Sequence, residues 1–223
     1  MLGIDTCGPR GSVALGQMSA DALEILGQTE LEGRSYSATL VAAVGDLLAR
    51  HGVGLRGIGC IVAVNGPGSF TGVRVGLSAV KGLAEGAEIP VLAVSRLEVL
   101  ARKAGVASAA LDAHRHEVFL RVAGNESESR ELLAGAGELG EIQPTPVEIA
   151  VCDEAACALL VSAWPGTSVV RVAAPTAADA LEVAAARVRA GKFADLALLD
   201  GHYLRRSDAE IFGGAAATQG QRT

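Results

Sequence analysis

Aromatic residues make up only 3% of this 223-residue chain, although half of its residues are apolar. A core built from Ala, Val and Leu suits the closely packed layers of an α/β protein better than an aromatic-rich sandwich. No apolar run approaches the roughly 20 residues of a membrane-spanning helix. The chain also opens directly into Leu2-Gly3-Ile4, without the charged segment and cleavage site of a signal peptide. We therefore expect a cytoplasmic protein that makes no membrane contact.

Positive charge and paired cysteines are also lacking. The formal net charge is −6. Because neutralisation of phosphates supplies most of the affinity for nucleic acid, we do not expect this chain to hold nucleic acid by itself. The four cysteines, Cys7, Cys60, Cys152 and Cys157, include no Cys-x-x-Cys pair. This spacing predicts reduced thiols rather than a disulfide framework.

The most informative stretch of the sequence is a strand, a tight turn and a helix between residues 58 and 85. The apolar, β-branched run 58–64 predicts a buried strand that stops at Asn65-Gly66-Pro67-Gly68. Ser69 or Thr71 is a candidate N-cap of the helix that follows. The turn lacks both the P-loop spacing and the G-x-G-x-x-G spacing, so a tight connection is a better interpretation than a phosphate cradle.

Two stripes run along that helix. Val73, Leu77, Val80 and Ala84 form a core-facing stripe, whereas Gly72, Gly76, Ala79 and Leu83 form a second stripe of mostly small residues. An interior glycine costs a helix about 1 kcal/mol relative to alanine. The second stripe therefore predicts the close approach of another backbone, which we interpret as a partner protein.

The order of predicted elements occurs twice along the chain. Strands at 2–5, 11–16, 23–31, 58–64 and 90–94, with helices at 35–50, 70–85 and 95–103, give the order β-β-β-α-β-α-β-α. The second half repeats it more weakly, with strands at 107–111, 117–122, 130–133, 147–151 and 169–173 and helices at 153–163 and 176–190. We predict an α/β protein of two related lobes, residues 1–104 and 105–223, with a polar loop at 124–140 and a disordered tail beyond about residue 213.

Three segments resemble one protein family. They are the opening L-G-I-D-T-C, the block N-G-P-G-S-F-T-G-V-R-V-G-L-S-A-V-K-G-L-A at 65–84, and Y-L-R-R-S-D-A-E at 203–210. Together they are similar to the TsaB (YeaZ) family, bacterial proteins that take part in making threonylcarbamoyladenosine on tRNA. The resemblance implies a two-lobed actin/hexokinase-like ATPase (ASKHA) fold, with duplicated β-β-β-α-β-α lobes.

The central block also resembles TsaD, the catalytic relative, in which a histidine pair holds a metal. Arg96 and Leu100 stand where those two ligands would be. A protonated guanidinium and an alkyl group cannot ligate a metal, so no metal site is expected there. In ATPases of this fold the first hairpin binds metal and phosphate, and Asp5 and Thr6 match it as a vestigial nucleotide loop. Cys7 replaces a usual glycine, however, and Pro9 removes an N–H donor.

Two other candidate sites are weaker. Asp112, His114 and His116 share one face of a predicted strand, and His-x-His can bind a metal, although a solvated hairpin edge is the simpler interpretation. Ser69 lies in a glycine turn but has no G-x-S-x-G context, so helix capping explains it better than nucleophilic catalysis.

The resemblance implies a non-catalytic dimerisation and activating subunit of the tRNA N6-threonylcarbamoyladenosine (t6A) complex. We expect it to bind and activate TsaD, to work with the ATPase TsaE, and to meet tRNA only through the complex. A homodimer of the isolated chain is left open, and no cofactor is expected beyond weak ATP or ADP binding at the interface of the complex. The partner interface is predicted on two doubly apolar helices, through Tyr36, Leu40, Ala43, Leu47, Gly72, Arg74, Gly76, Ala79 and Leu83. The alternative function is a metal- or ATP-dependent hydrolase of the glycoprotease type.

Overall fold

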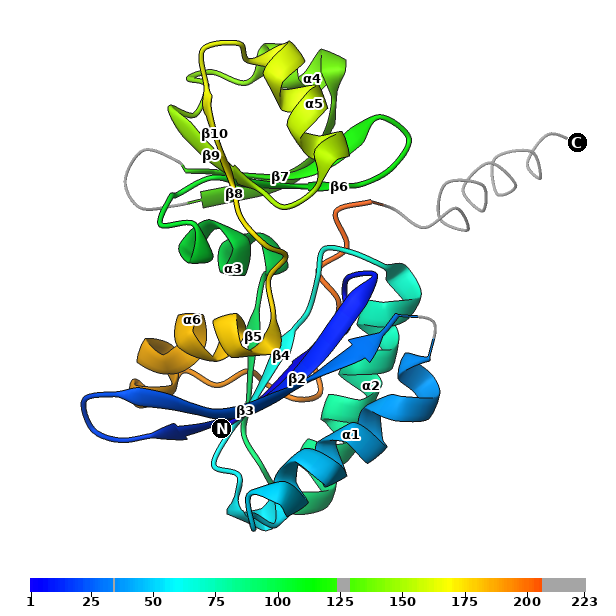
Figure 1. Ribbon diagram of the computed structural model, residues 1–223, viewed down its shortest axis with the longest axis vertical. Coiled ribbons are helices and arrows are strands. Elements are labelled where there is room, and N and C mark those ends of the chain that lie inside the picture. Colours follow the sequence, from blue (N-terminus) through cyan, green and yellow to red (C-terminus); the bar gives the residue numbers. More distant parts are fainter. Residues whose placement is uncertain (34, 124–128, 206–223) are drawn as a thin grey trace, which may run out of the picture.

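The structure, a computed structural model, describes residues 1–33, 35–123 and 129–205. Two five-stranded mixed sheets organise these residues (Figure 1). The first sheet has the order β3-β2-β1-β4-β5 and the second the order β10-β9-β6-β7-β8. The strands are β1 (Leu2–Asp5), β2 (Arg10–Met18), β3 (Leu23–Glu32), β4 (Ile61–Val64), β5 (Val91–Val94), β6 (Ala109–Asp112), β7 (Glu117–Ala123), β8 (Ser129–Gly135), β9 (Glu148–Val151) and β10 (Ser168–Arg171).

The helices repeat in the same way as the strands. They are α1 (Tyr36–Arg50), α2 (Phe70–Ala87), α3 (Arg96–Lys103), α4 (Ala136–Glu141), α5 (Glu154–Ala163) and α6 (Ala177–Arg189), together with a short 3₁₀ turn at Leu55–Gly57. Read in reverse, the second sheet matches the first strand for strand, so the predicted duplication is confirmed. In both lobes three consecutive antiparallel strands precede two parallel connections through helices.

The last helix of each lobe packs against the other lobe. Figure 1 shows α3 and α6 between the two sheets, with α1 and α2 on the outer side of the first sheet and α4 and α5 on that of the second. Helix α6 contacts every strand of the first sheet, whereas α3 contacts β6, β7 and β9. The predicted division at residue 104 is therefore corrected, because it assigned α3 to the first lobe and α6 to the second. Local periodicity identifies a helix but not the sheet that its apolar face covers.

Ion pairs join α3 to α6 across this interface. Lys103 lies 2.7 Å from Asp179, and Arg187 lies 3.0 Å from Glu98. Asp179 also completes the predicted capping box of α6 with Thr176. The segment after α6 returns along the first sheet, where Ala194 bridges to Val91. The lobes are thus held together by the helix pair as well as by the chain crossings.

Two predictions about irregular segments have different outcomes. Of the polar loop expected at 124–140, residues 129–140 form β8 and most of α4, so that part of the prediction is wrong. The remainder of that loop and the disordered tail lie outside the described residues. Within the described residues, no helix is long and apolar enough to cross a membrane.

Candidate functional site

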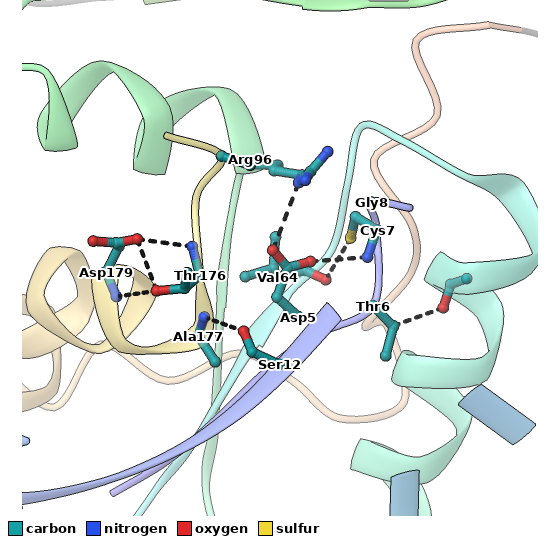
Figure 2. Close-up of polar contacts among 12 residues, drawn as sticks. Asp5, Thr6, Cys7, Gly8, Ser12, Val64, Arg96, Thr176, Ala177 and Asp179 are labelled. Carbon is teal, nitrogen blue, oxygen red and sulfur yellow. Dashed lines mark hydrogen bonds and ion pairs between the residues drawn. The ribbon is translucent and has the colours of Figure 1, made fainter. Parts of the chain in front are cut away.

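The turn that follows β1 is polar and buried. Thr6 Oγ1 donates a hydrogen bond to the carbonyl of Gly72 at 2.7 Å, and the Cys7 amide donates to Asp5 Oδ1 at 2.8 Å (Figure 2). The Ser69 amide donates to the Cys7 carbonyl at 2.7 Å. This turn is therefore attached to the start of α2, where Ser69 Oγ accepts from the Gly72 amide and caps the helix as predicted.

The glycines of α2 allow this close attachment. A β-carbon at Gly72 would overlap the Thr6 carbonyl, one at Gly76 would overlap Thr6 Oγ1, and one at Gly68 would overlap the Cys7 carbonyl. The sequence correctly indicated a close neighbour for Gly72 and Gly76, but that neighbour is the chain's own β1 turn. Both glycines are buried, so their assignment to a partner interface is wrong.

The carboxylate of Asp5 faces a cation from the other lobe. Arg96 is the first residue of α3, and its Nε lies 3.6 Å from Asp5 Oδ2 (Figure 2). Both side chains are buried, and neither Arg96 Nε nor Asp5 Oδ2 has a hydrogen-bond partner. Burial, the largest influence, lowers the pKa of Arg96, but the attraction of Asp5 and of neighbouring Cys7, Cys152 and Tyr36 outweighs it and raises the pKa above its usual value.

In this arrangement both side chains of the predicted nucleotide loop contact the chain itself, and nucleotide binding there stays a prediction. The carboxylate of Asp5 is opposed by Arg96, and the hydroxyl of Thr6 is used by Gly72. A β-carbon at Gly8 would overlap a terminal nitrogen of Arg96, so the guanidinium also fills the space beside the loop. Burial, with a smaller contribution from Asp5, raises the pKa of the Cys7 thiol well above its usual value, which keeps this thiol protonated and inert.

The positions compared with metal ligands are also used structurally. Leu100 is fully buried in the second-lobe core, and Arg96 makes the ion pair with Asp5. In the β6–β7 turn, His114 Nδ1 lies 3.0 Å from Asp112 Oδ2. No group of three His, Cys, Asp or Glu side chains within the described residues is arranged to hold a metal ion.

The predicted interface residues divide between the core and the surface. Helix α1 packs on β2, β3 and α2, and its buried side includes Tyr36, Leu40, Ala43 and Leu47. Their assignment to a partner interface is wrong, because the stripe with the strongest periodicity is the one that faces the chain's own sheet. Ala79 and Leu83 are half-buried and Arg74 is exposed. These three stay predictions.

Sequence reasoning missed the exposed apolar side of α1. Val41 has 59% of its surface exposed, and the exposed residues Ala38, Ala42, Gly45 and Ala49 lie on the same helix side at i, i+3, i+4, i+7 and i+11. A β-carbon at Gly45 would meet no atom within 4 Å. Val44 and Leu48 lie at i+3 and i+7 from Val41 but are buried. Only the packing of α1 on its own sheet therefore separates them from Val41.

Sequence reasoning also missed a polar cavity of about 320 Å³ beside the carboxyl ends of β4 and β5. It is lined by Asn65, Ala93, Ser95, Arg121, Ser129, Glu131 and His202. Glu131 accepts hydrogen bonds from Ser95 at 2.6 Å and Arg121 at 2.7 Å, and it lies 2.9 Å from His202 Nε2. Burial, the largest influence, raises the pKa of Glu131, but its hydrogen bonds outweigh burial and lower the pKa overall. Glu131 therefore joins the second sheet to α3 and to the C-terminal segment.

Comparisons with known proteins agree with this architecture. The family model of TsaD, tRNA N6-adenosine threonylcarbamoyltransferase, matches residues 28–136. The tRNA threonylcarbamoyladenosine biosynthesis protein TsaB of Haemophilus influenzae is 38% identical over 96 residues, which are 40% of this chain and 41% of that protein. TsaB of Escherichia coli is 38% identical over 128 residues, which are 53% of this chain and 52% of that protein. The chain thus spans about half the length of these relatives or less.

The solved structure of YeaZ from Pseudomonas aeruginosa extends the likeness to both lobes. It superposes with a TM-score of 0.73 at 28% identity, over 91% of this chain and 98% of that one. The shared two-lobed α/β architecture agrees with the fold implied by the three sequence motifs. The curated relatives and the solved structures together support a relationship of this chain to the TsaB/YeaZ family.

Proposed function

We propose that this chain is a non-catalytic subunit of the t6A-forming complex, which binds and activates a TsaD-type transferase. The observation that carries the proposal is the Asp5–Arg96 ion pair. In this pair the guanidinium of Arg96 lies beside the carboxylate that a metal-bound nucleotide would need. The Thr6 hydroxyl donates its hydrogen bond to the Gly72 carbonyl. A catalytic role would require these buried contacts to break.

The docking surface is the exposed apolar side of α1, centred on Val41, together with Ala79 and Leu83 of α2. An exposed apolar helix side with small residues suits close packing against helices of a partner. The contact area would favour one arrangement of the transferase lobes, which is activation by differential binding. TsaE joins the complex through the transferase, which makes most of the tRNA contacts, and weak ATP or ADP binding belongs to the interface with the transferase.

Paired substitutions in the two lobes test this proposal. We expect Val41→Asp to abolish capture of the TsaD protein from the same organism, because the new carboxylate would be buried unpaired at the interface. Its matched control is Val161→Asp on α5, where the valine is 53% exposed. Both variants should keep the wild-type thermal midpoint. Normal capture of the transferase by Val41→Asp would refute the assigned surface, and no capture by the wild type would refute the function.

A further inference from the structure

An exposed cluster of one cation and two aromatic rings lies where the C-terminal segment meets α2. The guanidinium carbon of Arg74 is 3.7 Å from the centroid of the Phe70 ring and 5.9 Å from that of Tyr203. The two rings lie 5.2 Å apart, tilted by 48°. Arg74 Nε donates a hydrogen bond to the Tyr203 hydroxyl at 3.4 Å. We call Phe70, Arg74 and Tyr203 the cation–aromatic platform.

The platform is held in place although it is exposed. The Tyr203 ring lies against Gly201, where a β-carbon would be only 2.5 Å from the ring. The Tyr203 amide donates to the Gly201 carbonyl at 3.0 Å, and the His202 amide donates to the Asn65 carbonyl at 2.7 Å. The backbone therefore fixes a tyrosine that is still 38% exposed beside a phenylalanine that is 41% exposed. Because both rings stay exposed, they add little buried apolar surface to the hydrophobic core.

The chemistry of the platform suits a planar group next to an anion. Within the described residues, the terminal nitrogens of Arg74 bond no acceptor, while the ring contacts keep its guanidinium oriented. A guanidinium of fixed orientation binds phosphate oxygens, and exposed aromatic rings stack unpaired bases. An acidic peptide would satisfy Arg74 but would leave both rings uncovered. We propose that the cation–aromatic platform contacts single-stranded RNA, with a base on the rings and its phosphate at Arg74. The inference rests on the proposed function, because it places this chain in an RNA-modifying complex.

The segment that follows the platform reaches the start of β7. Arg205, two residues after Tyr203, pairs with Glu117, and the preceding turn between β6 and β7 carries His114-Arg115-His116. All three residues have left-handed φ angles of 60°, 57° and 62°. This backbone costs about 1–2 kcal/mol for each residue other than glycine and commonly persists at functional sites. The C-terminal segment thus joins the platform to a turn of uncommon backbone conformation.

The net charge of −6 limits this contact to a weak one in the isolated chain. We would titrate the isolated chain at low salt into a fluorescently labelled single-stranded RNA of about ten nucleotides. The same titration would be repeated with the complex of this chain and its transferase. Phe70→Leu removes the ring, Arg74→Gln removes the charge, and Arg56→Gln on the exposed 3₁₀ turn is the matched control. Capture of the transferase would be measured on every variant.

We expect Phe70→Leu to weaken RNA binding about tenfold with an unchanged salt dependence, because it removes stacking. Arg74→Gln should weaken binding and reduce the salt slope by about one, whereas Arg56→Gln should change neither. The proposal is overturned if the wild-type chain does not bind RNA at low salt, or if neither Phe70→Leu nor Arg74→Gln changes the RNA affinity. It is also overturned if these variants lose transferase capture while their RNA affinity is unchanged, or if polyglutamate displaces the labelled RNA as effectively as unlabelled RNA does. If the wild type does not capture the transferase, the proposed function fails, and the titration of the isolated chain still decides the RNA contact.

Discussion

Substitution of Gly76 by alanine measures how tightly the β1 turn packs on α2. The new β-carbon would overlap Thr6 Oγ1, while it would lie 3.5 Å from Thr6 Cβ, an ordinary contact. Helix propensity favours alanine by about 1 kcal/mol. Displacement of Thr6 loses a buried hydrogen bond worth about 1 kcal/mol, and overpacking costs about 1–3 kcal/mol more. We expect a net loss of about 2 kcal/mol, which lowers the thermal midpoint of a chain of this size by about 4–8 °C.

The assay is thermal unfolding of four variants by circular dichroism. Gly82→Ala is the control within the same helix, because a β-carbon at Gly82 meets no atom within 4 Å, and it should raise the midpoint slightly. Thr6→Ala removes the oxygen that clashes, so Gly76→Ala in that background should no longer destabilise. If Gly76→Ala is as stable as Gly82→Ala, the attachment of the turn to the helix is wrong.

Three further predictions concern the ion pair, the polar cavity and the metal content. Arg96→Met should destabilise the fold by about 3–5 kcal/mol, because it leaves Asp5 buried without a cation, and Asp5→Asn in the same chain should recover part of the loss in urea unfolding. Because the pKa of Glu131 is lowered in the folded chain, its ionised form contributes stability that is present above the ordinary value of 4.5 and is lost as the pH falls through the lowered value. The midpoint of the wild type should therefore fall more steeply on acidification than that of Glu131→Gln, and parallel curves would contradict this. Elemental analysis of protein purified without chelators should find no stoichiometric zinc or iron, whereas one equivalent per chain would restore the hydrolase hypothesis.

Much of the architecture could be predicted from local sequence. The buried strand expected at 58–64, of which Ile61–Val64 form β4, lies close in the chain to the glycine turn and the Ser69 cap, so nearest-neighbour chemistry decides them. The same holds for the capping box of Thr176 and Asp179. The repeated order of elements predicted two related lobes, because each lobe needs the same strand pairings to bury its own sheet. The block at 65–84 also carries the family resemblance by itself.

Only the tertiary structure decided which apolar surfaces remain available. Periodicity places Leu40 and Val41 on different sides of α1, but it cannot tell which side meets the chain's own sheet, because both sides are apolar. Gly76 needed a close neighbour on any interpretation, and the neighbour is Thr6, 70 positions earlier in the chain. The Asp5–Arg96 pair likewise joins residues at the carboxyl ends of β1 and β5, which only the strand order of the first sheet brings to the same edge. Contacts between distant residues follow from how the layers stack, and the stacking depends on all the apolar faces of the chain at once.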